Sequence, residues 1–226
     1  MRIRHPITNN YAFLLVGLLL LFFITPMMRA YPGMDENIRL RWVCLQTSFI
    51  VMMTIGVWSL HREVIFFWIK LVAMGLSIVL AVTEYFHPNQ AIQLLVMLLV
   101  LLYCLISVFV ASRHVFSSQT VDRNLLYGAV CVYLLMGIIW ALVYGMICEF
   151  RPESFRGMEN ANGKIPFDNF IYYSFVTQAS LGYGDITPLT PLTRTLACIE
   201  VIAGQFYMAI LVAGLVSMYL QNHDRR

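Results

Sequence analysis

Long apolar runs dominate the chain, and short polar segments separate them. Four runs carry no charged residue and two carry one each: Tyr11–Met28, Trp42–Leu60, Ala91–Ala111 and Leu125–Ile147, then Val64–Val82 with Lys70 and Thr195–Leu220 with Glu200. A helix needs about 20 predominantly apolar residues to cross the hydrocarbon core of a bilayer. The pattern therefore predicts an all-α membrane protein with six transmembrane helices.

The connection between the last two runs differs from the other loops. Its first part, Glu149–Lys164, is polar and predicts an exposed turret. Asp168 then has the right place and chemistry to be the N-cap of a short apolar helix over Asn169–Ser180. About three turns of helix are too short to cross a bilayer. The short helix and the glycine-rich segment after it predict a re-entrant hairpin, which needs cover from protein or a watery cavity.

Composition agrees with a membrane protein. Hydrophobic residues make up 60% of the 226 positions and charged residues only 12%, against about 25% charged in average soluble domains. The net charge of +3 gives no indication of a nucleic-acid partner. The five cysteines have neither metal-ligand nor disulfide spacing, and we expect no cofactor and small buried residues at Cys44, Cys104, Cys131, Cys148 and Cys198.

The segment Ser180-Leu-Gly-Tyr-Gly-Asp185 resembles the selectivity filter of the potassium channel superfamily, whose usual form is Thr-Val-Gly-Tyr-Gly. The resemblance extends from about Leu125 to Leu220, because the segment follows a short helix and lies between two spans. It implies a potassium-selective ion channel, not an enzyme, with a pore helix and filter between helices five and six. One filter per chain cannot form a ring, so it also implies a homotetramer surrounded by membrane lipids.

The resemblance assigns ion binding to the filter backbone. The implied potassium sites use the oxygens of Ser180, Leu181, Gly182 and Tyr183, with Gly184 completing the filter. Glycine at positions 182 and 184 permits backbone torsions that a residue with a Cβ resists. The Ser180 hydroxyl is expected to supply the innermost ligand. Serine lacks the threonine methyl group that restrains the side-chain rotamer, so this site is expected to be softer.

Side chains near the filter are expected to support it. Leu181 and Tyr183 should point away from the ion path and pack against the short helix, and Asp185 should add negative charge at the mouth. By resemblance, Tyr172 and Tyr173 take the place of an aromatic pair that braces the filter from behind. The filter-supporting residues are therefore predicted to be Asp185, Tyr172, Tyr173 and Thr177.

The sixth run contains two glycines and an acid. The resemblance makes Gly204 and Gly214 candidate gating hinges, while ordinary helix packing is an equal alternative for Gly204. An intramembrane acid is a functional candidate by default. For Glu200 we favour a structural clamp to hydroxyl or backbone groups behind the short helix. For Lys70 in the third run, we expect the side chain to reach the cytoplasmic interface.

The first four runs form a predicted N-terminal domain over residues 1–115, and the pore domain follows over 116–226. Voltage sensors carry arginines at every third position of their fourth helix, and Ala91–Ala111 has none, so steep voltage gating is not expected. Basic residues are divided evenly between the two sides, and orientation rests on the resemblance alone. It implies cytoplasmic termini in a plasma membrane, and the compact size suggests a prokaryotic protein.

Other functions are less well supported. A weakly selective cation channel remains the first alternative, because serine replaces the usual threonine. A potassium-uptake transporter subunit would carry internal repeats with paired broken helices, and the first four runs contain no second glycine-rich hairpin. A membrane enzyme is disfavoured because no cluster of histidine and acidic residues lies at one depth.

Overall fold

The computed structural model describes residues 11–29, 38–59, 64–87, 89–117, 122–158 and 165–224. Its elements are α1 (Tyr11–Arg29), α2 (Ile38–Ser59), α3 (Val64–Phe86), α4 (Gln90–Ser117), α5 (Arg123–Phe150), the 3-10 turn η1 (Pro152–Ser154), β1 (Phe155–Arg156), α6 (Phe167–Gln178), β2 (Thr187–Pro188) and α7 (Pro191–Asp224). Each predicted span lies on one long helix. The all-α prediction is therefore confirmed.

Four of these helices are long and apolar enough to cross a membrane within the part whose side chains are described: Phe66–Phe86, Gln90–Ser117, Arg123–Phe150 and Pro191–Ser217. The corresponding apolar parts of α1 and α2 are shorter, over Tyr11–Phe23 and Gln46–Gly56. The chain thus has several helices suited to a multi-pass membrane protein. That α1 and α2 also cross the membrane, which would bring the number of spans to six, stays a prediction.

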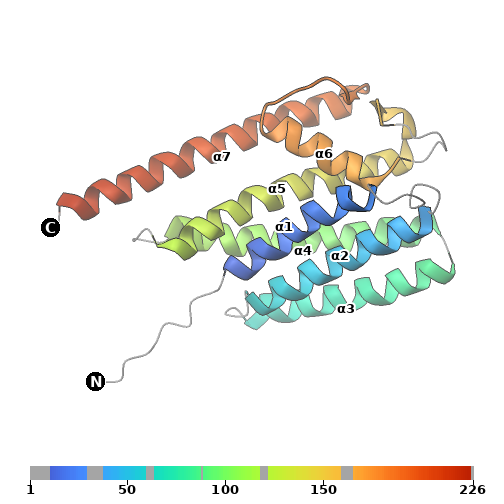
Figure 1. The fold of residues 1–226 in the computed structure, drawn as a ribbon, viewed down its shortest axis with the longest axis horizontal. Helices are drawn as coiled ribbons and strands as arrows, with labels where there is room; N and C mark the ends of the chain where they lie inside the picture. Colours follow the sequence, from blue (N-terminus) through green and yellow to red (C-terminus); the bar gives the residue numbers. More distant parts are fainter. Residues whose placement is uncertain are drawn as a thin grey trace.

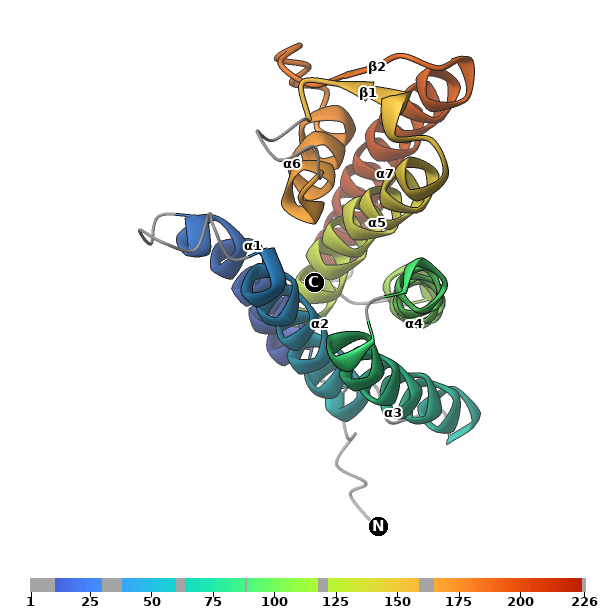
Figure 2. The ribbon, with the colours of Figure 1, turned by 90° about the vertical axis from the view of Figure 1, so that its right-hand side faces the viewer.

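The long helices run roughly along one common direction, and α6 lies near one end of the bundle (Figure 1). The helix α7 ends at the opposite end of the molecule from α6 (Figure 1). Seen along the bundle, α5, α6 and α7 form one part, and α1 to α4 lie on the other side of α5 (Figure 2). The short helix α6 lies beside both α5 and α7 and packs against each of them (Figure 2).

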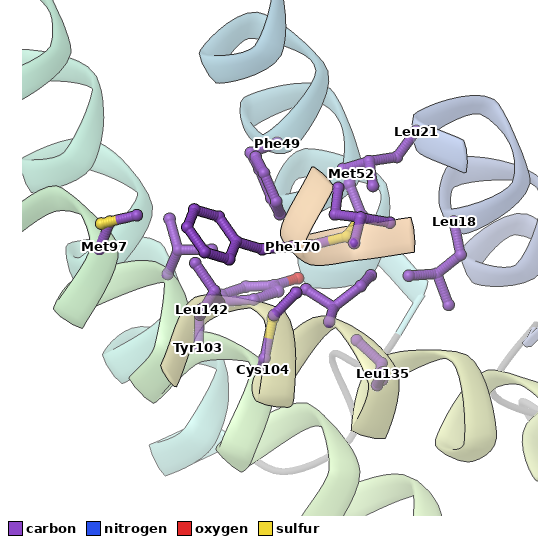
Figure 3. Packing of buried hydrophobic residues seen from close by; sticks show 14 of the residues in the cluster. Leu18, Leu21, Phe49, Met52, Met97, Tyr103, Cys104, Leu135, Leu142 and Phe170 are labelled. Carbon is purple, nitrogen blue, oxygen red and sulfur yellow. The ribbon is translucent and has the colours of Figure 1, made fainter. Parts of the chain in front are cut away.

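One continuous hydrophobic core joins the two parts of the chain. Figure 3 shows side chains of α1, α2, α4, α5 and α6 meeting in it, among them Leu18, Leu21, Phe49, Met52, Met97, Tyr103, Cys104, Leu135, Leu142 and Phe170. Two edge-to-face aromatic contacts reach the short helix directly. Phe22 of α1 lies 5.1 Å from Phe175, and Phe49 of α2 lies 5.8 Å from Phe167, measured between ring centres. The first helices therefore buttress α6.

Lys70 does not reach an interface. Its side chain is only 1% exposed, its Nζ lies 5.4 Å from the centre of the Tyr103 ring, and no described residue gives Nζ a hydrogen bond. The prediction for Lys70 is wrong because α3 turns this residue into the bundle. Near the other end of α3, Glu84 is also buried and accepts a 2.6 Å hydrogen bond from the Gln46 amide.

The segment before the short helix also differs from its prediction. The helix α6 begins at Phe167, with Pro166 at the N-cap position and no side-chain cap, so Asp168 is a first-turn residue and not the cap. Its carboxylate still complements the positive end of the helix dipole. The turret is not uniformly exposed, since Phe155 and Met158 are buried. Residues 159–164 of the predicted turret lie outside the described residues.

The buried part of the turret is held by the chain that leaves the candidate filter. The strands β1 and β2 pair antiparallel, with Phe155 opposite Pro188 and Arg156 opposite Thr187. The ring of Phe155 packs edge-to-face on Tyr173 of α6 at 5.0 Å between ring centres. The exit from the candidate filter is therefore tied to the end of α5 and to α6.

Candidate functional site

The end of α6 determines how the candidate filter begins. The Leu181 N–H donates to the Val176 carbonyl and the Ser180 N–H donates to the Thr177 carbonyl, each at 2.9 Å. These two bonds form a Schellman motif, in which the residue after the helix cap takes the left-handed conformation. That residue is usually glycine, and here it is Ser180, with a φ of 57°. The helix end therefore imposes the backbone conformation of Ser180.

The sign of φ alternates along the next residues. It is positive at Ser180, Gly182 and Gly184, with values of 57°, 57° and 80°, and negative at the two residues between them. Alternation of this kind turns successive peptide groups toward the same side, as in the nests where backbone N–H groups converge on an anion. The carbonyl oxygens can then line the other side of the strand. Glycine suits positions 182 and 184 because it has no Cβ penalty for positive φ.

The side chains between these residues are largely exposed in the single chain. Leu181 is 57% exposed and Tyr183 is 67% exposed. More than half of each side chain is therefore uncovered in one chain, and the expected packing of both against the short helix stays a prediction. A hollow of about 350 Å³ lies behind the strand, and its walls include Thr177, Gly182 and Gly184. Within one chain, this part of the site is open.

The predicted aromatic pair has two different environments. Tyr172 is on the exposed side of α6, and its hydroxyl donates to Asp185 Oδ2 at 2.8 Å. The hydrogen bond to the Asp185 carboxylate raises the pKa of the Tyr172 hydroxyl above its ordinary value, so the phenol keeps its proton. Tyr173 is buried on the other side of α6, 5.3 Å from the Tyr144 ring between centres. Of the two tyrosines, Tyr172 is therefore the one whose hydroxyl bonds to Asp185, directly after the candidate filter.

Glu200 joins three helices behind the short helix. Its side chain has no exposed surface. One carboxyl oxygen, Oε2, accepts a 2.7 Å hydrogen bond from the Tyr144 hydroxyl of α5, and the other, Oε1, lies 2.5 Å from Ser174 Oγ of α6. These contacts are those of the clamp favoured from the sequence. They link α7 to α5 and to α6, the helix that precedes the candidate filter.

A count of hydrogens determines the charge that these contacts require. Ser174 Oγ also lies 2.7 Å from the Gly137 carbonyl, which can only accept. The three contacts are Tyr144 with Glu200, Ser174 with Glu200, and Ser174 with Gly137, and each needs one hydrogen. The hydroxyls of Ser174 and Tyr144 supply only two. A protonated Glu200 carboxyl would supply the third hydrogen. The contacts are therefore all satisfied when Glu200 is protonated and donates to Ser174.

Gly204 lies where α7 passes closest to the end of α6. A Cβ at this position would lie 2.6 Å from the backbone carbonyl oxygen of Gln178, the last residue of α6. Gln178 is fully buried, and its amide donates to the Tyr133 carbonyl at 2.9 Å. The packing alternative for Gly204 thus has a definite partner. At Gly214, by contrast, a Cβ would meet no described atom within 4 Å.

Gln205 is a site residue that sequence reasoning missed. Its side-chain amide donates to Ser180 Oγ at 3.0 Å, across a separation of 25 residues. Tyr144 and Ser174 were also not predicted, although both contact Glu200. The available signal for Gln205 was a polar amide within an otherwise apolar span. Nothing in the sequence indicated which helix end it would face.

Comparisons with known proteins locate the similarity in this part of the chain. Residues 129–221 match the family described as "Ion channel". The chain is 31% identical over 107 residues to two-pore potassium channel 5 of Arabidopsis thaliana, and 38% identical over 93 residues to two pore potassium channel c of Oryza sativa subsp. japonica. The matches cover 47% and 40% of this chain but only 23% and 18% of those relatives. The chain is therefore similar to ion channels from α5 through most of α7, the part that contains α6 and the candidate filter.

Proposed function

We propose that the chain is a subunit of a potassium channel that conducts ions passively through residues 180–184. The observation that carries the proposal is the alternating sign of φ along this segment, which lets successive carbonyls face one side. A dehydrated potassium ion needs such a row of oxygen ligands in place of water. The similarity of residues 129–221 to ion channels, and to two plant proteins named as potassium channels, supports the same function.

The proposed channel is a homotetramer. One chain offers a single filter strand, whose Leu181 and Tyr183 side chains are more than half exposed beside an open hollow. Only further copies can close the strand into a ring with four-fold symmetry. Four-fold symmetry of purified particles is the expected result. A stable monomer or dimer that conducts potassium would contradict the tetramer.

The proposed topology has six spans, cytoplasmic termini and a plasma-membrane location. The helix α4 carries no arginine before Arg113, near its end, so the four N-terminal helices lack the charge repeat of a voltage sensor. Opening is therefore proposed to depend only weakly on voltage. A measured gating charge of several elementary charges per channel would contradict this part of the proposal.

Purified protein in a planar bilayer tests the conduction proposal. Step-like unitary currents are expected, with a reversal potential close to that of potassium when sodium and potassium are mixed. Equal permeability to both ions would favour the weakly selective channel. A slow flux that saturates would favour a transporter. The absence of any flux would refute both a channel and a transporter.

Replacing Ser180 by glycine separates stability from selectivity. A non-glycine residue in the left-handed conformation costs about 1–2 kcal/mol, and Ser180 has this conformation at the end of α6. The S180G protein is expected to unfold at an equal or slightly higher temperature while its potassium-to-sodium permeability ratio falls, because the hydroxyl ligand is lost. Thermal unfolding and reversal potentials measure the two effects. Unchanged selectivity would show that the hydroxyl is not an ion ligand.

A further inference from the structure

The innermost site of the proposed filter needs a restraint on its hydroxyl. Serine has no second heavy atom on Cβ, so its χ1 angle is freer than that of threonine. Ser180 is also exposed in the single chain, and its backbone is fixed by the end of α6 without any constraint on Oγ. A hydroxyl that rotates freely would present its hydrogen, as well as its lone pairs, to a cation.

The helix α7 brings a side-chain amide to this hydroxyl. Gly204 allows α7 to approach the Gln178 carbonyl closely, because any Cβ there would lie 2.6 Å from that oxygen. The next residue is Gln205, whose Nε2 lies 3.0 Å from Ser180 Oγ. We infer that Gln205 is a positioning residue of the filter, which fixes the rotamer of Ser180 so that its oxygen faces the innermost ion. This inference rests on the proposed function.

The hydrogen-bond inventory explains how the contact orients the oxygen. A serine hydroxyl has one hydrogen and two acceptor lone pairs. The Gln205 N–H occupies one lone pair. The second lone pair remains for a cation, and the hydroxyl hydrogen is left to point elsewhere. Gln205 thereby supplies from the inner helix the restraint that a threonine methyl group would supply within its own side chain.

A double-mutant cycle tests the inference. The Q205M variant keeps a long unbranched side chain but removes the donor. Its potassium-to-sodium permeability ratio is expected to fall about fivefold, the factor that corresponds to one ordinary hydrogen bond. In the S180A background, the same substitution should change the ratio by much less, because the acceptor is already absent. The control M208L, one turn further along α7, should leave the ratio unchanged.

The outcomes distinguish the inference from the proposed function. If wild-type protein gives no potassium-selective current, the proposed function fails and the inference fails with it. If the wild type is selective and Q205M has the same permeability ratio, only the inference is overturned. An equal loss in the S180A background also overturns it, since Gln205 would then act without the hydroxyl. If Q205M does not assemble, Q205N provides the same comparison, because its shorter side chain withdraws the amide from Ser180.

Discussion

The E200A variant is expected to lose most of its stable assembled protein, whereas E200Q should stay close to the wild type. Alanine would leave the buried Tyr144 hydroxyl without its acceptor, and Ser174 would keep only the Gly137 carbonyl. An unsatisfied buried group costs about 1–3 kcal/mol, so a loss of about 2 kcal/mol is expected before any cost of the cavity. The unfolding midpoint and oligomer size in detergent measure the loss.

Glutamine should preserve the clamp because it reproduces the hydrogens of a protonated carboxyl. Its N–H group can donate to Ser174, and its carbonyl oxygen can accept from Tyr144, which is the arrangement that the hydrogen count requires. The control E84Q changes a buried acid in α3, away from the filter, and should leave currents unaltered. If E200Q were as damaging as E200A, Glu200 would be ionised and the hydrogen count would be wrong. If E200Q assembled normally but showed altered pH-dependent gating, Glu200 would have a gating role beyond a clamp.

The helices could be predicted from the sequence because uninterrupted apolar runs leave few other structures in a bilayer. Their ends and faces were harder to predict. The helix α4 continues beyond the predicted Ala111 to Ser117, through Arg113 and His114. Lys70 was placed wrongly although Lys70, Ser77 and Glu84 recur at seven-residue intervals on one face of α3, and all three are buried. Only the neighbouring helices decide that Lys70 points toward Tyr103.

The candidate filter was recognised from its glycines, and both have the positive φ that their residue type suggests. The conformation of Ser180 was not predictable in the same way, because it follows from a Schellman motif whose two hydrogen bonds do not depend on the serine side chain. Gln205 was missed for a different reason. Its contact with Ser180 exists only because α7 approaches the end of α6. The two residues are 25 positions apart, and no local sequence pattern predicts that they come together.

The G204A variant is expected to disturb the filter through packing. The atom that a new Cβ would meet at 2.6 Å is a backbone carbonyl, so it cannot be relieved by a change of rotamer. Moving the Gln178 carbonyl would shift the end of α6, from which the filter strand begins. Overpacking of this kind costs about 1–3 kcal/mol. A lower unfolding temperature and a reduced potassium-to-sodium permeability ratio are therefore expected together.

The same variant separates packing from the hinge role that the resemblance suggests for Gly204. A hinge needs torsional freedom, so under that hypothesis G204A would slow or prevent opening while stability and selectivity stayed normal. G75A provides the matched control, because a Cβ on Gly75 of α3 meets no described atom within 4 Å. Alanine is favoured over glycine within a helix by about 0.5–1 kcal/mol, so G75A should be at least as stable as the wild type. A loss confined to G204A would identify the contact with Gln178, and not helix propensity, as the reason for glycine at this position.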